Sequence, residues 1–452
     1  MAKLVILGAG LTGLSAAYHL EQAGHFDYLI FEKNDRPGGL LRSFQQDGFT
    51  FDFTGHYLHI NNNYFRTFLD ATVGIHNLDS ITRKAAIYSH GVFCNYPFQM
   101  NLHGLPLEVI YECMDGYLKR KTSLKTPQSF YAWVLKYFGT GIGKHFFFPY
   151  NRKLLAYDLH KIVASWTGRF VPQTNFKAIL TGALQPTDQH VGYNSLFYYP
   201  KSGGIEFLIK KMASSLKNKV KTNHEAISID LSKKTVLFSN GHQESFDQLI
   251  TTMPLNLFLK RVAQNARTPF KHLGEKLLCN TVINFNLGFK QHELLDKHWI
   301  YFPEKEYPFY RLGFWHNISK ASVKKNCSAL YGEIAYLPGS VSEKQIENLT
   351  NKAIKKTLNF LHLNNSMIVT EKILKLDHAY VIYDHWREKQ LPVLLGHLKS
   401  YNVHSVGRFG GWNYSSMQEA VGYGKEIAEQ LLEKIGEHTL VLKTDQKEFG
   451  KI

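Results

Sequence analysis

The chain has 452 residues, 44% of them hydrophobic and 14% aromatic, and its lysines and arginines outnumber its aspartates and glutamates by 53 − 37 = 16. This composition excludes a disordered or collagen-like chain, and the length favours two or three packed domains. No apolar run is long enough to cross a bilayer, and no signal-peptide pattern precedes the first predicted strand. The four cysteines show neither metal nor disulfide spacing, so we expect a cytoplasmic protein without a metal site.

The positive charge suits an anionic ligand, a nucleic acid or a membrane surface, although a generally basic surface is the simpler interpretation. The sequence contains no nucleic-acid-binding module, internal repeat or low-complexity stretch. We therefore expect no nucleic-acid partner.

The N-terminal stretch KLVILGAGLTGLSAAYHL predicts a buried strand, a tight turn and a helix. Gly8, Gly10 and Gly13 have the spacing G-x-G-x-x-G, which allows a tight turn, a close backbone approach and close packing of helix on strand. Leu11 and Thr12 begin the helix, whose N-terminus would receive a pyrophosphate. The alternative is an ordinary strand–helix turn.

A second predicted strand, DYLIFE, ends at Glu32, 19 residues after Gly13, and is followed by Lys33. A carboxylate at this distance is expected to meet the ribose hydroxyls of a bound dinucleotide.

The next stretch, EKNDRPGGLLRSF, contains Gly39, Leu40 and Arg42. It resembles the R-x-G-G-x-x-x-S/T motif of two-dinucleotide-binding flavoproteins, the superfamily of amine oxidases, protoporphyrinogen oxidase and UDP-galactopyranose mutase. GFTFDFTGHYLH resembles their G-x-x-F-D-x-G-x-H motif, which places Gly55 and His56 against the flavin. The resemblance implies bound FAD, and the alternative for His56 is a structural histidine.

Two later stretches resemble the returning parts of the same FAD domain. One ends at Thr251 to Pro254, and the other, VGRFGGWNYSSMQEAVGYGKEIAEQLLEKI, contains Gly407, Ser416 and Met417. The second stretch predicts a core-facing helix whose N-terminus would point at the flavin and favour an anionic reduced ring.

We therefore predict an α/β fold with a discontinuous Rossmann-like FAD domain and two insertions that form a cleft over the flavin. The predicted parts are an FAD domain at 1–61, 202–254 and 385–436, a mainly helical insertion at 62–201, a sheet-containing substrate domain at 255–384 and a polar tail at 437–452.

Five further stretches, in order along the chain, resemble UDP-galactopyranose mutases of the eukaryotic type. They are YPFQMNLHGLP, FFPYNRKLLA, GYNSLFYYPKSGGIEFL, HWIYFPEKEYPFYR and GRFGGWNY. The implied substrate is a nucleoside-diphosphate sugar, with UDP as the first choice of nucleotide, and a homo-oligomer is compatible with the sequence.

A nucleotide sugar offers a flat base, a charged diphosphate and sugar hydroxyls, and the motifs contain side chains suited to each. Arg311 and Arg408 suit the diphosphate because the guanidinium stays charged and donates two hydrogen bonds at once. The other expected ligand contacts are Tyr301, Tyr380 and Tyr414 to phosphate, Tyr96, Phe98 and Gln99 to uracil, Asn151 and Asn194 to hydroxyls, and Trp299 to the sugar. The alternative for Arg311 is a buried sheet in which it pairs with a carboxylate.

The resemblance implies a change of sugar ring size with no net redox change. In such mutases reduced FAD attacks the anomeric carbon through N5, the diphosphate leaves, and the sugar recloses from a flavin–sugar adduct. Arg311 and Arg408 would hold the diphosphate and His56 would steady the flavin, with NADPH or NADH as candidate reductants.

The chain departs from the mutase pattern at Leu155, Thr54 and His59, where tryptophan, glycine and an aromatic residue are usual. A missing proline after Tyr380 leaves Tyr383 as an alternative phosphate contact. Two other functions stay open: a flavin oxidase or dehydrogenase of the amine oxidase or protoporphyrinogen oxidase kind, and a non-catalytic protein that binds flavin or a nucleotide sugar.

Overall fold

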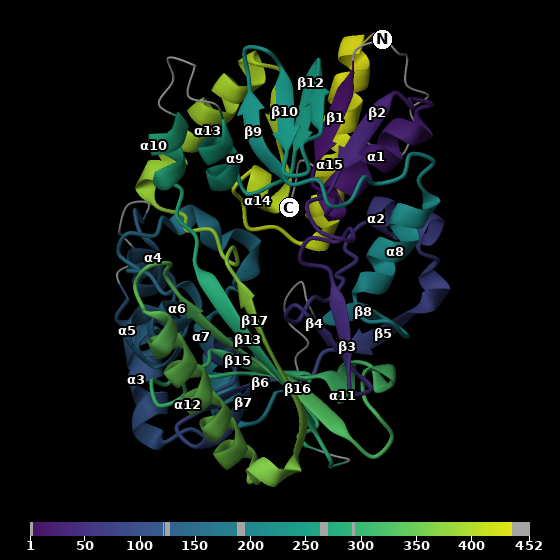
Figure 1. The fold of residues 1–452 in the computed structure, drawn as a ribbon. Coiled ribbons are helices and arrows are strands. Elements are labelled where there is room, and N and C mark those ends of the chain that lie inside the picture. The colour runs from purple at the N-terminus through teal and green to yellow at the C-terminus, as the bar shows by residue number, and fades with distance from the viewer. Residues whose placement is uncertain are drawn as a thin grey trace.

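A parallel four-stranded sheet forms one end of the molecule (Figure 1). The computed structural model describes residues 3–120, 122, 127–187, 195–262, 270–291 and 294–435. The sheet has the order β18-β12-β1-β2, with β1 (Leu4–Leu7), β2 (Tyr28–Phe31), β12 (Gln248–Thr251) and β18 (Val403–Ser405). Because neighbouring parallel strands need a crossover, β1 and β2 are joined through α1 (Leu11–Gln22). The predicted α/β class is confirmed.

Helix α1 packs on the C-terminal helix α15 (Met417–Ile435), although about four hundred residues separate them. A side chain at Gly424 would lie 2.5 Å from Ser15 Cβ, so the two helices touch at a glycine. The Ser15 hydroxyl donates a 2.8 Å hydrogen bond to the carbonyl oxygen of Val421. The last helix thereby fixes the orientation of the first.

A second, seven-stranded sheet forms the opposite end, with the order β17-β13-β16-β15-β14-β6-β7. Its strands are β6 (Ala85–Ser89), β7 (Val92–Asn95), β13 (Thr281–Phe289), β14 (Trp299–Tyr301), β15 (Arg311–Phe314), β16 (Ser328–Tyr336) and β17 (Ile368–Leu376). Strands β6 and β7 come from the segment predicted as a mainly helical insertion. Strand β6 connects that segment to the sheet by pairing in parallel with β14.

Three smaller sheets connect these parts. They are β3 (Ser43–Gln46) with β4 (Phe49–Asp52), β5 (Leu78–Thr82) with β8 (Leu196–Pro200), and β9 (Ala226–Asp230), β10 (Thr235–Phe238) and β11 (Gln243–Ser245).

Helices surround both large sheets (Figure 1). They are α2 (Asn63–Thr72), α3 (Leu107–Leu118), α4 (Phe130–Tyr137), α5 (Gly139–Ile142), α6 (Phe148–Leu155), α7 (Phe176–Leu184), α8 (Glu206–Ser215), α9 (Leu255–Arg261), α10 (Phe270–Glu275), α11 (Trp315–Ile318), α12 (Glu343–Leu361), α13 (His385–Ser400) and α14 (Gly407–Gly410). Within the described ranges, none has both the length and the apolar character needed to cross a bilayer.

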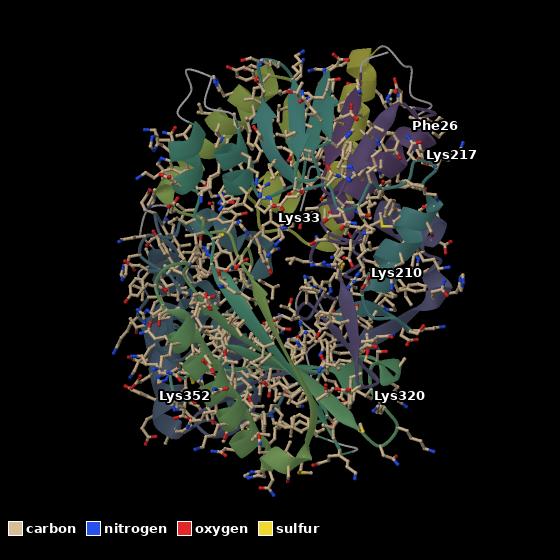
Figure 2. All side chains as sticks on the ribbon, viewed as in Figure 1. Phe26, Lys33, Lys210, Lys217, Lys320 and Lys352 are labelled. Atoms are coloured by element: carbon tan, nitrogen blue, oxygen red, sulfur yellow. The ribbon has the colours of Figure 1, made fainter. Side chains whose placement is uncertain are left out.

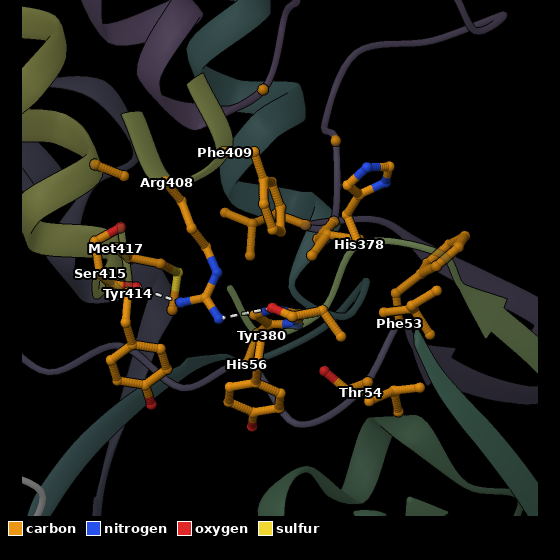
Figure 3. A pocket seen from close by; sticks show the side chains of 18 of the residues that line it. Phe53, Thr54, His56, His378, Tyr380, Arg408, Phe409, Tyr414, Ser415 and Met417 are labelled. Atoms are coloured by element: carbon orange, nitrogen blue, oxygen red, sulfur yellow. Dashed lines mark hydrogen bonds between the residues drawn. The ribbon is translucent and has the colours of Figure 1, made fainter. Parts of the chain in front are cut away.

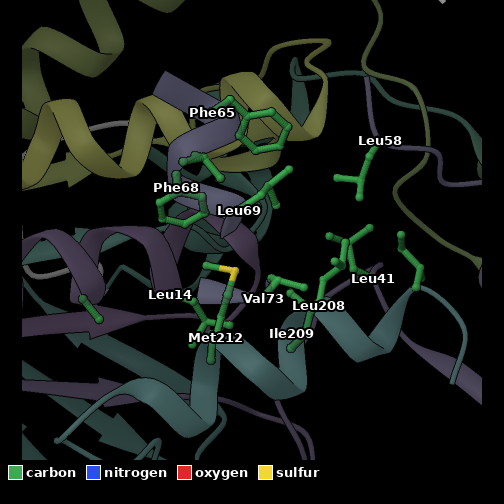
Figure 4. Packing of buried hydrophobic residues seen from close by; sticks show 14 of the residues in the cluster. Leu14, Leu41, Leu58, Phe65, Phe68, Leu69, Val73, Leu208, Ile209 and Met212 are labelled. Atoms are coloured by element: carbon green, nitrogen blue, oxygen red, sulfur yellow. The ribbon is translucent and has the colours of Figure 1, made fainter. Parts of the chain in front are cut away.

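One hydrophobic cluster joins the parallel four-stranded sheet to the adjacent helices (Figure 4). Leu14 of α1 lies in the same cluster as Phe65 and Phe68 of α2 and Leu208 and Met212 of α8, and all five are buried. Each such side chain contributes about 1.5–3 kcal/mol when it is removed from water. This packing holds α2 and α8 against the parallel four-stranded sheet.

The positive charge is spread over the surface. Lys210, Lys217, Lys320 and Lys352 point outward from separate parts of the molecule, from α8 to α12 (Figure 2). This distribution fits the interpretation of a generally basic surface.

Candidate functional site

A cavity of about 930 Å³ lies between the parallel sheet and the seven-stranded sheet. Its walls come from segments far apart in the sequence, including the ends of β1 and β2, the loop after β4, β14, β15 and the segment after β18. The cavity receives residues at the C-terminal ends of parallel strands, where open α/β sheets bind ligands.

The glycine-rich turn forms one wall of the cavity, and Gly13 and Gly10 have different roles in it. A side chain at Gly13 would lie 2.0 Å from the carbonyl oxygen of Gly8, so glycine here lets α1 pack on β1. A side chain at Gly10 would meet no protein atom closer than the Gly39 Cα at 3.9 Å. The protein therefore has room at Gly10, and the space in front of it suits a ligand.

Replacing these two glycines by alanine should separate folding from cofactor binding. We expect Gly13→Ala to lower the free energy of unfolding by about 2 kcal/mol or more, because helix and strand must move apart. Gly10→Ala should fold normally but lose bound flavin, because the new methyl group occupies the ligand space. Thermal unfolding and flavin absorbance per chain measure both effects, and full flavin content in Gly10→Ala would contradict this role.

The end of β2 supplies a carboxylate to the same wall. Glu32 is buried and accepts a 3.0 Å hydrogen bond from the backbone N–H of Ala9, inside the glycine-rich turn. Its other oxygen accepts bonds from the backbone and side chain of Asn34. These bonds fix the carboxylate beside the turn, where a dinucleotide ribose would lie. Lys33 lines the cavity next to it.

The loop after β4 brings His56 to the cavity. Its Nδ1 is buried and has no hydrogen-bond partner among the described residues. Burial, followed by the nearby charges of Arg408 and Arg311, lowers the pKa of His56 to about 3, so the ring is neutral. Thr54 has φ +84°, a backbone conformation that favours glycine. Glycine is the usual residue at this position of the flavoprotein motif that the loop resembles. The backbone turn is thus kept despite the substitution.

Arg408 follows β18 and extends into the cavity between two tyrosines (Figure 3). Its guanidinium donates to the carbonyl oxygens of Ser415 (2.9 Å) and Ala379 (3.0 Å). Its Cζ lies 4.7 Å from the ring centre of Tyr414 and 5.7 Å from that of Tyr380. No carboxylate pairs with Arg408 among the described residues, so its positive charge is available to an anionic ligand.

Arg311 lines the same cavity but has a carboxylate partner. Its Nε and Nη2 donate to the two oxygens of Glu333 at 2.8 and 2.7 Å. Burial alone would lower the pKa of Arg311, but Glu333 outweighs it and raises the pKa well above its ordinary value. Arg311 therefore lines the cavity, as predicted, and also pairs with a buried carboxylate, as the alternative interpretation predicted.

Aromatic residues make most of the wall near the two arginines. Trp299 stacks on Tyr57 with ring centres 5.0 Å apart, and Tyr301 faces Tyr96 at 5.6 Å. Burial raises the pKa of Tyr301 and of Tyr380, so both hydroxyls stay protonated and can donate to phosphate oxygens.

Most residues predicted for the site line this cavity. They are Gly8, Gly10, Leu11, Thr12, Glu32, Lys33, Gly39, Leu40, Arg42, Gly55, His56, Gly407, Ser416 and Met417 for the cofactor, and Tyr96, Gln99, Asn151, Trp299, Tyr301, Arg311, Tyr380, Arg408 and Tyr414 for the substrate.

Phe98 is fully buried and stacks on Phe146 with ring centres 5.2 Å apart, so it belongs to the core and not to a uracil site. Gly13 supports the packing of α1 on β1, as the glycine spacing predicts, and does not line the cavity. Tyr383 accepts a hydrogen bond from the backbone of Tyr414 and is outside the cavity wall, which leaves Tyr380 as the tyrosine in contact with it. Asn194 lies outside the described residues.

The prediction missed several cavity residues, and Glu333, Tyr150 and Trp166 are three of them. Glu333 is a single acid within the apolar stretch SALYGEIAY, and that contrast was an available signal. Tyr150 lies within the stretch FFPYNRKLLA, next to the predicted Asn151. Trp166 also lines the wall, whereas Leu155, where tryptophan is usual, is buried in the core.

Six histidines with lowered pKa values are expected to make the folded protein less stable in acid. Burial is the main cause that lowers the pKa of His19, His59, His298, His378 and His404 to about 4 and of His56 to about 3, from an ordinary 6.5. The unfolded chain takes up these protons first, so stability is full above pH 6.5 and falls as the pH drops toward 4. At pH 5 each histidine costs the folded state about 2 kcal/mol.

Asp52 acts in the opposite direction, because burial raises its pKa to about 6. At pH 5 its protonation offsets about 1 kcal/mol of the stability that the histidines remove. We expect the unfolding midpoint to drop steeply between pH 7 and pH 5. His404→Gln should make the slope shallower, and the same change at exposed His272 should not. A midpoint that is flat over this range would contradict the assignment of neutral, buried rings.

The cavity fits FAD by three observations. The space at Gly10, at the N-terminus of α1, would suit a pyrophosphate, and Glu32 lies beside the turn, where a dinucleotide ribose would lie. The buried His56 Nδ1 and Ser415 Oγ have no partner among the described residues. Helix α15 begins at the cavity, with Ser416 and Glu419 capping it through reciprocal hydrogen bonds. The described residues contain no cluster of acids, histidines or cysteines suited to a metal ion.

The fold and this site define a flavoprotein with a dinucleotide-binding sheet and a substrate cavity over it. The chain belongs to the family of flavin-containing amine oxidoreductases, whose model matches residues 11–316.

The known proteins that resemble this chain include a mutase, an oxidase and a desaturase. A crystal structure of reduced UDP-galactopyranose mutase superposes with a TM-score of 0.89 and 27% identity, covering 96% of this chain and 94% of that one. Coproporphyrinogen III oxidase of Staphylococcus aureus (strain NCTC 8325 / PS 47) is 22% identical over 316 residues, which are 63% of this chain and 67% of that protein. A 4,4'-diapophytoene desaturase of S. aureus (strain COL) is 48% identical over 50 residues, only 10% of its length.

Proposed function

We propose that the protein is an FAD-dependent nucleotide-sugar mutase similar to UDP-galactopyranose mutase. The observation that carries the proposal is the convergence of Arg408 and Arg311, from β18–α15 and β15, on one cavity with His56. Burial is the main cause that lowers the pKa of His56, and the charges of Arg408 and Arg311 lower it further. The similarity to the mutase structure over nearly the whole chain supports the same reading.

Each residue has a definite task in such a reaction. When bound in its reduced form, the flavin supplies an electron pair to the sugar and recovers it, so no net oxidation is needed. Arg408 and the hydroxyls of Tyr380 and Tyr414 hold the diphosphate as its charge grows on leaving. Neutral His56 offers Nδ1 to the flavin. Aromatic rings of Trp299 and Tyr301 exclude water from the sugar.

The second candidate is an FAD-dependent oxidoreductase, which the similarity to coproporphyrinogen III oxidase favours. A porphyrinogen with several carboxylates would also benefit from cations in the cavity. The two candidates differ in their ligands, because only a mutase recognises a nucleoside diphosphate.

Ligand-dependent thermal unfolding separates them. We expect UDP at a hundred times its Kd to stabilise the flavin-loaded protein by about 2.7 kcal/mol, with no stabilisation by amines or coproporphyrin. Stabilisation by coproporphyrin and not by UDP would overturn the mutase proposal in favour of the oxidase.

A further inference from the structure

Glu333 bonds Arg311 in the cavity wall, and none of the sequence stretches that predicted site residues includes it. Arg311 and Glu333 are directly opposite in the antiparallel pair β15–β16, and Tyr301 is opposite Arg311 in β14. Residues opposite in register share one face of a sheet. Tyr301, Arg311 and Glu333 thus form a row across three strands that faces the ligand cavity.

The pair controls the direction of the guanidinium. Nε and Nη2 of Arg311 are both taken by Glu333, whose side chain is 1% exposed. Nη1 has no hydrogen-bond partner among the described residues, and the Arg311 side chain is 16% exposed. A guanidinium is a rigid plane, so fixing two of its nitrogen atoms fixes the third. A ligand therefore meets the Nη1 edge of Arg311.

The pair also controls the charge. The opposite charges of Arg311 and Glu333 cancel, whereas Arg408 bonds only carbonyl oxygens. Of these two arginines, only Arg408 then presents a positive charge without a carboxylate partner among the described residues to a diphosphate, which carries at least two negative charges. A diphosphate that must leave and return in every turnover should not be held too tightly, since dissociation slows as affinity rises.

We propose that Glu333 is a positioning residue of the ligand site, which aims Nη1 of Arg311 at the diphosphate and keeps the net cavity charge low. This inference deepens the proposed function and rests on it for the identity of the ligand. Glu333 touches Arg311 and acts on the ligand through it.

Variants of the flavin-loaded protein at Glu333 test the proposal. Glu333→Gln removes the negative charge, so UDP and inorganic pyrophosphate should bind about tenfold more tightly at low salt. The flavin midpoint potential should become more positive, because an added cation stabilises the anionic reduced ring. Glu333→Asp keeps the charge but shortens the side chain, so the potential should stay at the wild-type value while UDP affinity falls severalfold.

The matched control is Glu206→Gln, which breaks a buried carboxylate–arginine contact with Arg36 outside the cavity. It should change neither UDP affinity nor the potential. Should Glu333→Gln not fold, Arg311→Met with Glu333→Gln restores a neutral pair. That double variant should have the wild-type potential but lower UDP affinity.

Two results would overturn the proposal. One is an unchanged potential with weaker UDP binding in Glu333→Gln, as expected of a purely structural residue. The other is wild-type UDP affinity in both Glu333→Asp and the double variant. If wild type binds neither UDP nor pyrophosphate, the mutase proposal fails, whereas the potential still reports on the charge of Glu333.

Discussion

Replacing Arg408 by alanine is expected to weaken UDP binding by about 2 kcal/mol or more, roughly thirtyfold. The guanidinium lies among Tyr380, Tyr414 and Phe409, where a charge-assisted bond to phosphate is only weakly screened by water. Because Arg408 bonds carbonyl oxygens and no carboxylate, its removal leaves no buried charge unpaired. The ligand-free protein should therefore lose little stability.

Calorimetric titration with UDP, together with thermal unfolding, separates the two effects. Arg408→Lys keeps the charge with fewer donors and should have intermediate affinity. Arg387 is a matched control, since it donates to the Trp412 carbonyl, stacks on Tyr383 and is outside the cavity wall. Arg387→Ala should bind UDP normally. Unchanged UDP affinity in Arg408→Ala would remove this residue from the site.

Replacing Arg311 by alanine should damage both the fold and the site. Glu333 is completely buried, so the loss of its partner leaves a buried carboxylate without compensation. We expect the free energy of unfolding at pH 7 to fall by about 3–5 kcal/mol, and Arg311→Met with Glu333→Gln to recover most of it. Denaturant unfolding of the single and double variants measures the recovery.

An exposed pair serves as the comparison. Lys375 and Glu343 are 2.9 Å apart, with side chains 43% and 80% exposed. Such pairs contribute about 0–1 kcal/mol, so Lys375→Ala should barely change the unfolding curve. A similar loss in Lys375→Ala and Arg311→Ala would contradict the assigned role of the buried pair.

Local patterns predicted most of the residues that line the cavity around the glycine-rich turn. The glycine spacing from Gly8 to Gly13 and the carboxylate of Glu32 belong to one strand–turn–helix–strand unit, whose geometry depends on neighbours in sequence. The α/β class follows from the same unit.

The substrate half depends on contacts between distant segments, which one sequence does not specify. The pairing of Arg311 with Glu333 requires the register of β15 on β16, and the motif that contains Arg311 ends before Glu333. Phe98 and Gln99 are neighbours, yet Phe98 packs on Phe146 while Gln99 lines the cavity and donates to the Pro172 carbonyl. Likewise, β6 joins the seven-stranded sheet only because it meets β14, about two hundred residues later.

The similarity to oxidases and to a mutase reflects a shared cofactor fold, so the chemistry must be decided at the cavity. Carboxylates and phosphates both attract guanidinium groups. The distinguishing property is whether electrons are transferred from the substrate overall.

The most direct measurement incubates the flavin-loaded protein with UDP-galactopyranose and other nucleotide sugars, with and without dithionite, under nitrogen, and analyses the products by chromatography and mass spectrometry. The proposal predicts an isomeric nucleotide sugar of unchanged mass, formed only by the reduced protein. Absence of any isomer from a reduced protein that retains its flavin and binds UDP would contradict it.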